Sequence, residues 1–237
     1  MIGSVLEPVD IALWSLVIVV FFVVIIFFVN KHRKMEEGSG AFILGIVFFA
    51  TFFTLARVIE TIRRALFRTS YIEIFETNFQ LEGLDLIMRL SYYVFIWTGI
   101  AIFYFVFEKY VMNQRTKYIL MVTSLFTTFL SFVMYFIGWQ YWVFMVYAVC
   151  FFVVGLFPVI LFLYLSKSSI NRAQRIAWLI MIGGFLLLLI GVLGDMPEAY
   201  IVTQSLDPEF IRFFSPLGQA MGAVLMAYSL SIIYKYV

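Results

Sequence analysis

The chain has one cysteine and one histidine among 237 residues, and this scarcity excludes several kinds of site. Cys150 has no second cysteine with which to form an internal disulfide. His32 stands alone in a basic segment, so imidazoles cannot gather around zinc or haem iron. No histidine lies inside an apolar run, where it could serve a serine or a metal in hydrolysis. We therefore expect no metal, no cofactor and no catalytic residue, which argues against an enzyme.

Charged residues are also scarce, at 13% of the chain, whereas hydrophobic residues make up 64%. The mean hydropathy is +1.04, and a soluble domain of this composition could not cover itself with polar surface. No segment outside the apolar runs reaches the roughly 50 residues that a small soluble domain needs. The net charge of +2 is small and its basic residues are dispersed, so we expect no nucleic-acid partner.

Seven apolar runs of about twenty residues or more fill nearly the whole chain, and about twenty residues are needed to span a bilayer. They predict helices over residues 9–30, 40–67, 84–110, 118–137, 141–166, 176–193 and 210–234. The sequence therefore predicts an all-α integral membrane protein, with residues 1–237 forming a single seven-helix transmembrane domain in the lipid bilayer. A multi-pass protein of the cell membrane is the expected localisation.

Basic residues fall mainly in every second gap between these runs. Because cytoplasmic loops retain Lys and Arg, the pattern places the N-terminus outside and the C-terminus inside. Aromatic residues at both ends of the runs, such as Trp14 outside and Tyr110 inside, agree with two headgroup belts. We expect protein partners, or further copies of the chain, to contact the basic inner loops, which carry Arg115, Lys117, Arg172 and Arg175.

This layout resembles that of microbial rhodopsins, heptahelical receptors and the membrane sensor modules of some bacterial kinases. The resemblance is one of architecture and not of motifs. Rhodopsins carry a lysine in the middle of the last helix for retinal, whereas the last run here has only Lys235, at its inner end. The Asp-Arg-Tyr and Asn-Pro-x-x-Tyr signatures of the large receptor class and the Pro-Gln motifs of small sugar transporters are absent. The resemblance implies a rhodopsin- or receptor-like topology without the retinal lysine.

Charged side chains inside the runs are the strongest functional feature, since burying them is costly unless they are paired or useful. Arg57 and Glu60 lie in one run and Asp85 and Arg89 in the next, with Thr54 one turn deeper. Arg57 and Arg89 each lie roughly 10 Å inside the outer surface, at about 1.5 Å per residue. These groups predict an interhelical salt-bridge clamp, an outward-open site for a carboxylate, phosphate or zwitterion, or charged side chains that extend to the membrane interface. Asp195, at the outer end of residues 176–193, could join them.

Helix packing is indicated by small residues and one proline. Gly218 and Gly222 have the GxxxG spacing that permits close helix contact. Residues 176–193 contain several glycines and almost no polar side chain, which indicates either a closely packed or a flexible helix. Pro158 should kink the helix over 141–166. The outer gap from residue 68 to residue 85 fits either an interfacial helix or a hairpin.

Three functions fit this sequence. The first is a receptor- or sensor-like module that holds a small ligand in its outer half and acts through partner proteins. The second is a non-catalytic subunit of a larger membrane complex. The third is a small alternating-access transporter, which would need polar groups through the midplane. Below the charges, however, Phe48, Phe49, Phe52, Phe53, Phe103 and Phe105 predict a packed apolar wall.

Overall fold

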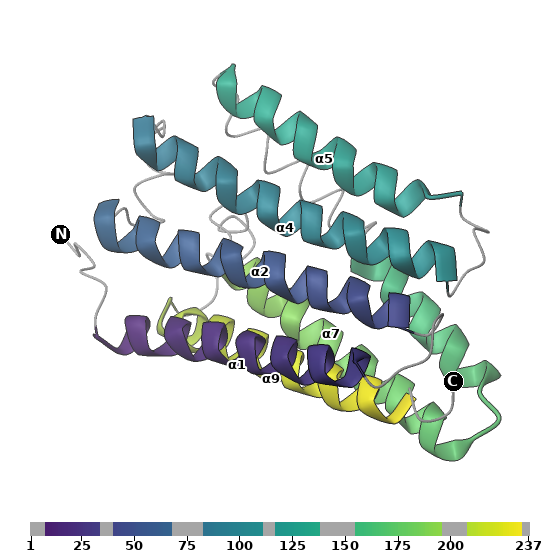
Figure 1. The fold of residues 1–237 in the computed structure, drawn as a ribbon. Coiled ribbons are helices and arrows are strands. Elements are labelled where there is room, and N and C mark those ends of the chain that lie inside the picture. Colours follow the sequence, from purple (N-terminus) through teal and green to yellow (C-terminus); the bar gives the residue numbers. More distant parts are fainter. Residues whose placement is uncertain are drawn as a thin grey trace. The chain divides into compact units, whose positions relative to one another are not determined.

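The computed structural model describes residues 8–33, 40–67, 83–110, 117–137, 155–195 and 208–233. Over these ranges the chain forms seven helices and no strand (Figure 1). They are α1 (Pro8–His32), α2 (Gly40–Phe67), α4 (Gly83–Tyr110), α5 (Ile119–Phe136), a helix over Gly155–Ser168, α7 (Arg172–Asp195) and α9 (Pro208–Ile233). The prediction of an all-helical chain is confirmed for these ranges.

Five of the helices are long and apolar enough to cross a membrane. These segments are Val9–His32, Ile43–Phe67, Gly83–Tyr110, Arg172–Gly194 and Phe213–Ile233. Large apolar side chains along them are exposed, such as Phe22 and Val23 at 58% on α1. Such a surface is stable in lipid and not in water. The two remaining predicted spans correspond to the shorter apolar helices α5 and Gly155–Ser168.

The helices group into two compact units, Met1–Cys150 and Phe151–Val237. In the first unit α2 packs on both α1 and α4, and α4 packs on α5. Consecutive helices run antiparallel: Gly45 near the start of α2 lies against Val106 near the end of α4, whereas Glu60 meets Arg89 at the opposite ends. Whether both units form a single seven-helix domain stays a prediction.

In the second unit α7 and α9 pack closely through glycine. A Cβ atom placed on Gly222 would come within 2.6 Å of the Gly184 carbonyl oxygen and the Leu188 nitrogen, and one on Gly184 within 2.9 Å of the Gly222 carbonyl oxygen. The GxxxG motif of α9 therefore lies in a helix–helix contact, and α7 is closely packed over this stretch.

Polar side chains reinforce the α7–α9 contact. The Ser215 hydroxyl and the Gln219 amide both donate to the Gly191 carbonyl, at 2.6 and 2.9 Å. The Ser229 hydroxyl donates to the carbonyl of Ala177 at the other end of the pair. Such hydrogen bonds between helices are a recognised source of association where no water competes.

The start of α7 corrects one prediction. Arg172 and Arg175 were expected in a loop, but they lie in the first turns of α7, which begins four residues before the predicted boundary. Asn171 causes the early start, because its side-chain oxygen accepts the Ala173 amide at 2.9 Å and caps the helix. Both arginines remain exposed at that end, and the Arg175 guanidinium donates to the Ser169 carbonyl.

Several predictions fall on residues outside the described ranges. They concern Arg115, Cys150, the outer segment from residue 68 to residue 82, and the first half of the helix predicted over 141–166. Pro158 lies in the first turn of the described helix Gly155–Ser168, so the kink that it should cause involves residues that the structure does not describe.

The glycine contact can be tested with a matched pair of alanine substitutions. Gly222→Ala should destabilise the protein by about 1–3 kcal/mol, because its methyl group would overlap backbone atoms of α7. Gly183→Ala is the control, since a Cβ there meets nothing within 4 Å. Thermal unfolding of the purified protein in detergent gives the melting temperature of each variant. Equal melting temperatures for the two would show that the helices do not pack in this way.

Candidate functional site

Six charged side chains gather where α2 ends and α4 begins, and we call them the arginine cluster. Its members are Arg57, Glu60, Arg63, Arg64, Asp85 and Arg89. The predicted depth of Arg57 was too small, although the predicted end of α2 at Phe67 was right. Glu60 and Arg89 are level, at about 10 Å and about 9 Å from their helix ends, whereas Arg57 lies about 15 Å inside.

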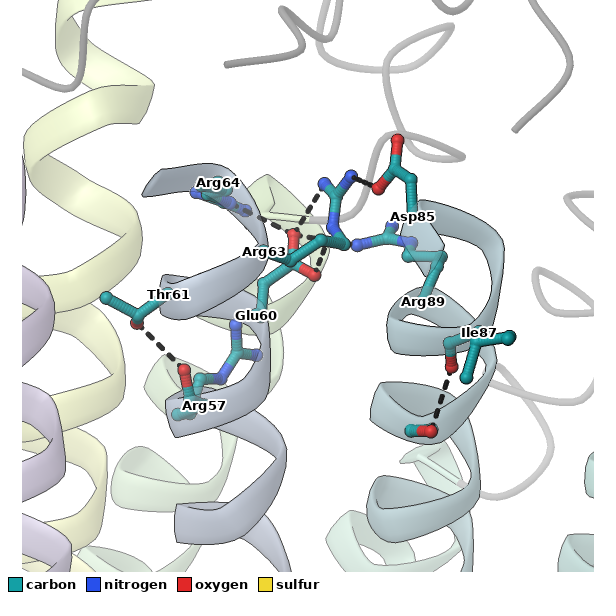
Figure 2. A network of polar contacts seen from close by, with 9 residues as sticks. Arg57, Glu60, Thr61, Arg63, Arg64, Asp85, Ile87 and Arg89 are labelled. Atoms are coloured by element: carbon teal, nitrogen blue, oxygen red, sulfur yellow. Dashed lines mark hydrogen bonds and ion pairs between the residues drawn. The ribbon is translucent and has the colours of Figure 1, made fainter. Parts of the chain in front are cut away.

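The Glu60 carboxylate is the centre of the cluster (Figure 2). Arg63 donates to both of its oxygens, from Nε at 2.9 Å and from Nη2 at 3.0 Å. Arg64 Nε lies 3.0 Å and Arg89 Nη1 lies 2.9 Å from its Oε1 atom. Glu60 is 2% exposed, so these bonds form away from water. One carboxylate therefore binds three guanidinium groups and joins α2 to α4.

Arg63 carries the network on to a second carboxylate. Its Nη1 atom lies 2.7 Å from Oδ1 of Asp85, in the first turn of α4 (Figure 2). Arg63 was not among the predicted site residues, although its spacing of three residues from Glu60 is that of neighbours on one helix face. The two carboxylates and their arginines thus make two links between α2 and α4, Glu60 to Arg89 and Arg63 to Asp85, which share Arg63 and Glu60 in one network.

Arg57 is held by aromatic rings. The centre of its guanidinium group lies 5.2 Å from the Trp14 ring, 5.0 Å from the Phe53 ring and 5.3 Å from the Tyr92 ring. These rings come from α1, α2 and α4, so Arg57 ties together three helices by cation–π attraction. Trp14 was expected in the outer aromatic belt, but it is 7% exposed and faces Arg57 and Arg64 inside the first unit.

The arginine cluster is largely buried and contains more cationic than anionic side chains among the described residues. Arg57, Arg63 and Arg89 are each 1% exposed, and the Arg64 side chain is the most open at 12%. The six residues carry four guanidinium groups and two carboxylates. Asp10 of α1 lies one turn before Trp14 at the same end and adds at most one more carboxylate. Over the described residues the cluster therefore keeps an excess of positive charge.

Phenylalanine rings fill the first unit below the cluster. Phe53 stacks on Phe21 of α1 at 4.6 Å and contacts Phe49 at 5.8 Å. Phe49 contacts Phe103 of α4, and Phe103 stacks on Phe107, each pair at 5.8 Å. The expected apolar wall is present in these residues, and we call it the phenylalanine ladder. Two residues expected in it face outward instead: Phe48 is 44% and Phe105 is 38% exposed.

A second buried carboxylate site lies at the far end of α4, and sequence analysis missed it. Glu108 is 0% exposed, and its two oxygens accept the backbone N–H groups of Leu120 at 3.1 Å and Met121 at 3.3 Å. These N–H groups begin α5 and have no partner within their own helix. A carboxylate also suits the positive end of a helix dipole. Glu108 therefore docks α5 onto α4.

The other predicted site residues have structural surroundings. Thr54 donates to the Ala50 carbonyl at 2.7 Å, within its own helix. Asp195 ends α7 in the second unit, so its participation in the cluster stays a prediction. Lys117 is exposed just before α5, in a left-handed backbone conformation with φ 49°.

Neither a protein-family model, nor a curated protein, nor a solved structure matches this chain.

The cluster predicts an asymmetric response to charge removal. Glu60→Gln should destabilise the protein by about 3–5 kcal/mol, because it leaves the buried Arg63 and Arg89 and the partly buried Arg64 without their shared carboxylate. Removing Arg89 as well should recover part of this loss, since it lowers the uncompensated charge. A double-mutant cycle in denaturant measures the coupling, with the exposed Arg172→Gln as control. Additive effects at positions 60 and 89 would contradict the ion pair.

Proposed function

We propose that the chain is a non-enzymatic, receptor- or sensor-like membrane module with seven spanning helices. It binds a small ligand at the arginine cluster and acts through partner proteins at its opposite, basic end. The observation that supports the proposal is the buried cluster of ionisable side chains at one end of α2 and α4. Buried ionisable groups within spanning helices are costly and usually functional.

The proposed orientation places the cluster outside and the basic ends inside. In support, Lys31 and His32 end α1, Lys109 lies in the last turn of α4, and Arg172 begins α7. Because consecutive helices of the first unit are antiparallel, the first two of these ends lie opposite the cluster. Retention of Lys and Arg on the cytoplasmic side then gives an external N-terminus, and the plasma membrane is the proposed location.

Cysteine labelling checks this orientation. In a Cys150→Ala background, Ser168→Cys should react with a membrane-impermeant maleimide only after cells are permeabilised. Ser168 is exposed at the end of its helix, so access to reagent depends on the side of the membrane alone. Ser4→Cys is the matched reporter and should react in intact cells. The reverse pattern would overturn the proposed topology.

A basic hairpin offers a contact for partners. Lys167, Arg172 and Arg175 are exposed around the short connection between Gly155–Ser168 and α7, and Ile170 at its tip is 100% exposed. An apolar tip rimmed by cations suits a protein surface with an apolar pocket and acidic margin. The same hairpin would serve a subunit of a larger complex, which is the second candidate function.

The phenylalanine ladder argues against transport through the first unit. A solute in transit needs groups that replace its hydration, and the phenylalanine rings in contact from Phe53 to Phe107 supply none. The hydroxyls of Thr51 and Thr54 do not change this, because both donate to carbonyls of their own helix. A transporter is therefore the least supported of the three functions.

Proteoliposomes and crosslinking test the proposal together. Uptake of labelled glutamate or phosphate should not exceed that of empty liposomes. A photo-reactive residue at position 170 should form a defined protein adduct in native membranes, and Arg172→Gln with Arg175→Gln should reduce it. The lipid-facing position Val19, at 56% exposure, is the crosslinking control.

Robust uptake that is abolished by Arg89→Gln would overturn the proposal and favour a transporter. An adduct at position 170 that is unchanged by the two arginine substitutions would remove the basic hairpin as the contact for partners.

A further inference from the structure

We infer that a buried water molecule is bound beside Pro216, where it donates hydrogen bonds to the side-chain oxygen of Gln219 and to the backbone carbonyl of Arg212. This site lies in the α7–α9 contact of the second unit, and it involves neither the arginine cluster nor the basic hairpin. Its ligand is defined by two acceptors that lie close together and by packing too tight for a larger molecule.

The Gln219 side chain supplies the first acceptor. Gln219 is 0% exposed and lies six residues inside the apolar span Phe213–Ile233, about 9 Å at about 1.5 Å per residue, so it has no contact with bulk water. Its Nε2 atom donates to the Gly191 carbonyl at 2.9 Å, which fixes the orientation of the amide, because the reverse orientation would set two oxygens against each other. Among the described residues, the Oε1 atom then has no hydrogen-bond partner. A buried acceptor without a donor raises the free energy of the folded protein, and a bound donor would lower it.

Pro216 creates the second acceptor. It lies inside α9 and has no N–H group, so it cannot donate to the carbonyl four residues earlier, which is that of Arg212. Membrane helices tolerate proline where another group, such as an ordered water, satisfies the carbonyl that the proline leaves free. A water molecule that inserts into the hydrogen-bond ladder of the helix is one such arrangement.

Helix geometry brings the two acceptors together. Gln219 follows Pro216 by three residues, so the two are neighbours on the surface of α9. Side chains on a helix tilt toward its N-terminus, and the Gln219 amide accordingly reaches the level of Ser215, because both side chains donate to the same Gly191 carbonyl, at 2.6 and 2.9 Å. The amide oxygen therefore lies beside the turn in which the Arg212 carbonyl loses its usual donor. One water molecule has two donors and can serve both acceptors.

Close packing restricts the ligand to the size of water. A Cβ atom on Gly191 would come within 2.8 Å of the Ser215 carbonyl oxygen and 2.9 Å of Cγ of Gln219, and one on Gly218 within 3.1 Å of the Leu187 carbonyl oxygen. α7 and α9 therefore approach too closely at this level to admit a larger molecule between them. A divalent cation is disfavoured as well, because the Gly191 carbonyl already accepts from two donors and such cations bind about six oxygens.

A double-mutant cycle tests the bridge by thermal unfolding of the full-length protein in detergent. Pro216→Ala supplies an N–H group to the Arg212 carbonyl, and Gln219→Met removes the amide while keeping the side chain long. If one water serves both acceptors, Gln219→Met should lower the melting temperature by about 2 °C or more less in the Pro216→Ala background than in the wild type. Ser215→Ala is the matched control, since it also removes a hydrogen bond to the Gly191 carbonyl, and its effect should be the same in both backgrounds.

Water-edited NMR of the glutamine-labelled protein in nanodiscs detects the water directly. Magnetisation should pass from water to the side-chain amide of Gln219 in the wild type, and this transfer should be lost in the Pro216→Ala variant. Gln174, which is half-buried near the start of α7, is the control and should receive magnetisation in both proteins. This measurement needs only the wild type and Pro216→Ala, so it decides the matter even if Gln219→Met does not fold.

Three results would overturn the inference. The first is the absence of transfer to Gln219 in the wild type, and the second is an equal effect of Gln219→Met with and without Pro216. The third is non-additivity of the same size for Ser215→Ala, which would assign the coupling to the shape of α9. None of these results bears on flux or on the adduct at position 170, so the proposed function is tested separately.

Discussion

The first unit depends on one buried carboxylate. Glu60 binds Arg63 and Arg64 of its own helix and Arg89 of α4, and Arg63 in turn binds Asp85. Inside a membrane such a network permits few arrangements of the two helices, because a buried charge is stable only beside the groups that compensate it. The network therefore sets the register of α2 against α4. It also brings Arg57 level with Trp14 and Tyr92, and so positions the aromatic groups that hold this fourth cation.

The two units solve the problem of helix association differently. Apolar side chains gain little by leaving lipid for one another, so membrane helices need close packing or polar contacts. The second unit uses Gly184 against Gly222 and hydrogen bonds to the Gly191 carbonyl. The first unit uses charges at one end, the phenylalanine ladder in the middle, and Glu108 at the other end, where it caps α5. The proposed receptor-like function fits this division, because the charged end holds the guanidinium and carboxylate groups that could bind a polar ligand.

Much of the fold follows from local composition. The lengths of the apolar runs predicted the boundaries of α2 without error and those of α1 within two residues, because hydropathy alone decides which segment is stable in lipid. The start of α7 was missed because a single side chain, Asn171, caps it. Arg63 was missed although its spacing from Glu60 is visible in the sequence. The role of Glu108 could not be read from residue spacing, because its partners are backbone N–H groups that almost any residue would supply.

By itself, the sequence determined that the chain is helical and suited to a membrane, and that charges and glycines lie at particular depths within its helices. These properties follow from the transfer of side chains between water and lipid, which depends on each residue and its near neighbours. Only the tertiary structure decided that Glu60 meets Arg89, that Gly222 meets Gly184, and that Phe53 faces inward while Phe48 faces out. Those pairings depend on how each helix is rotated about its axis, and rotation is set by the helix packed against it.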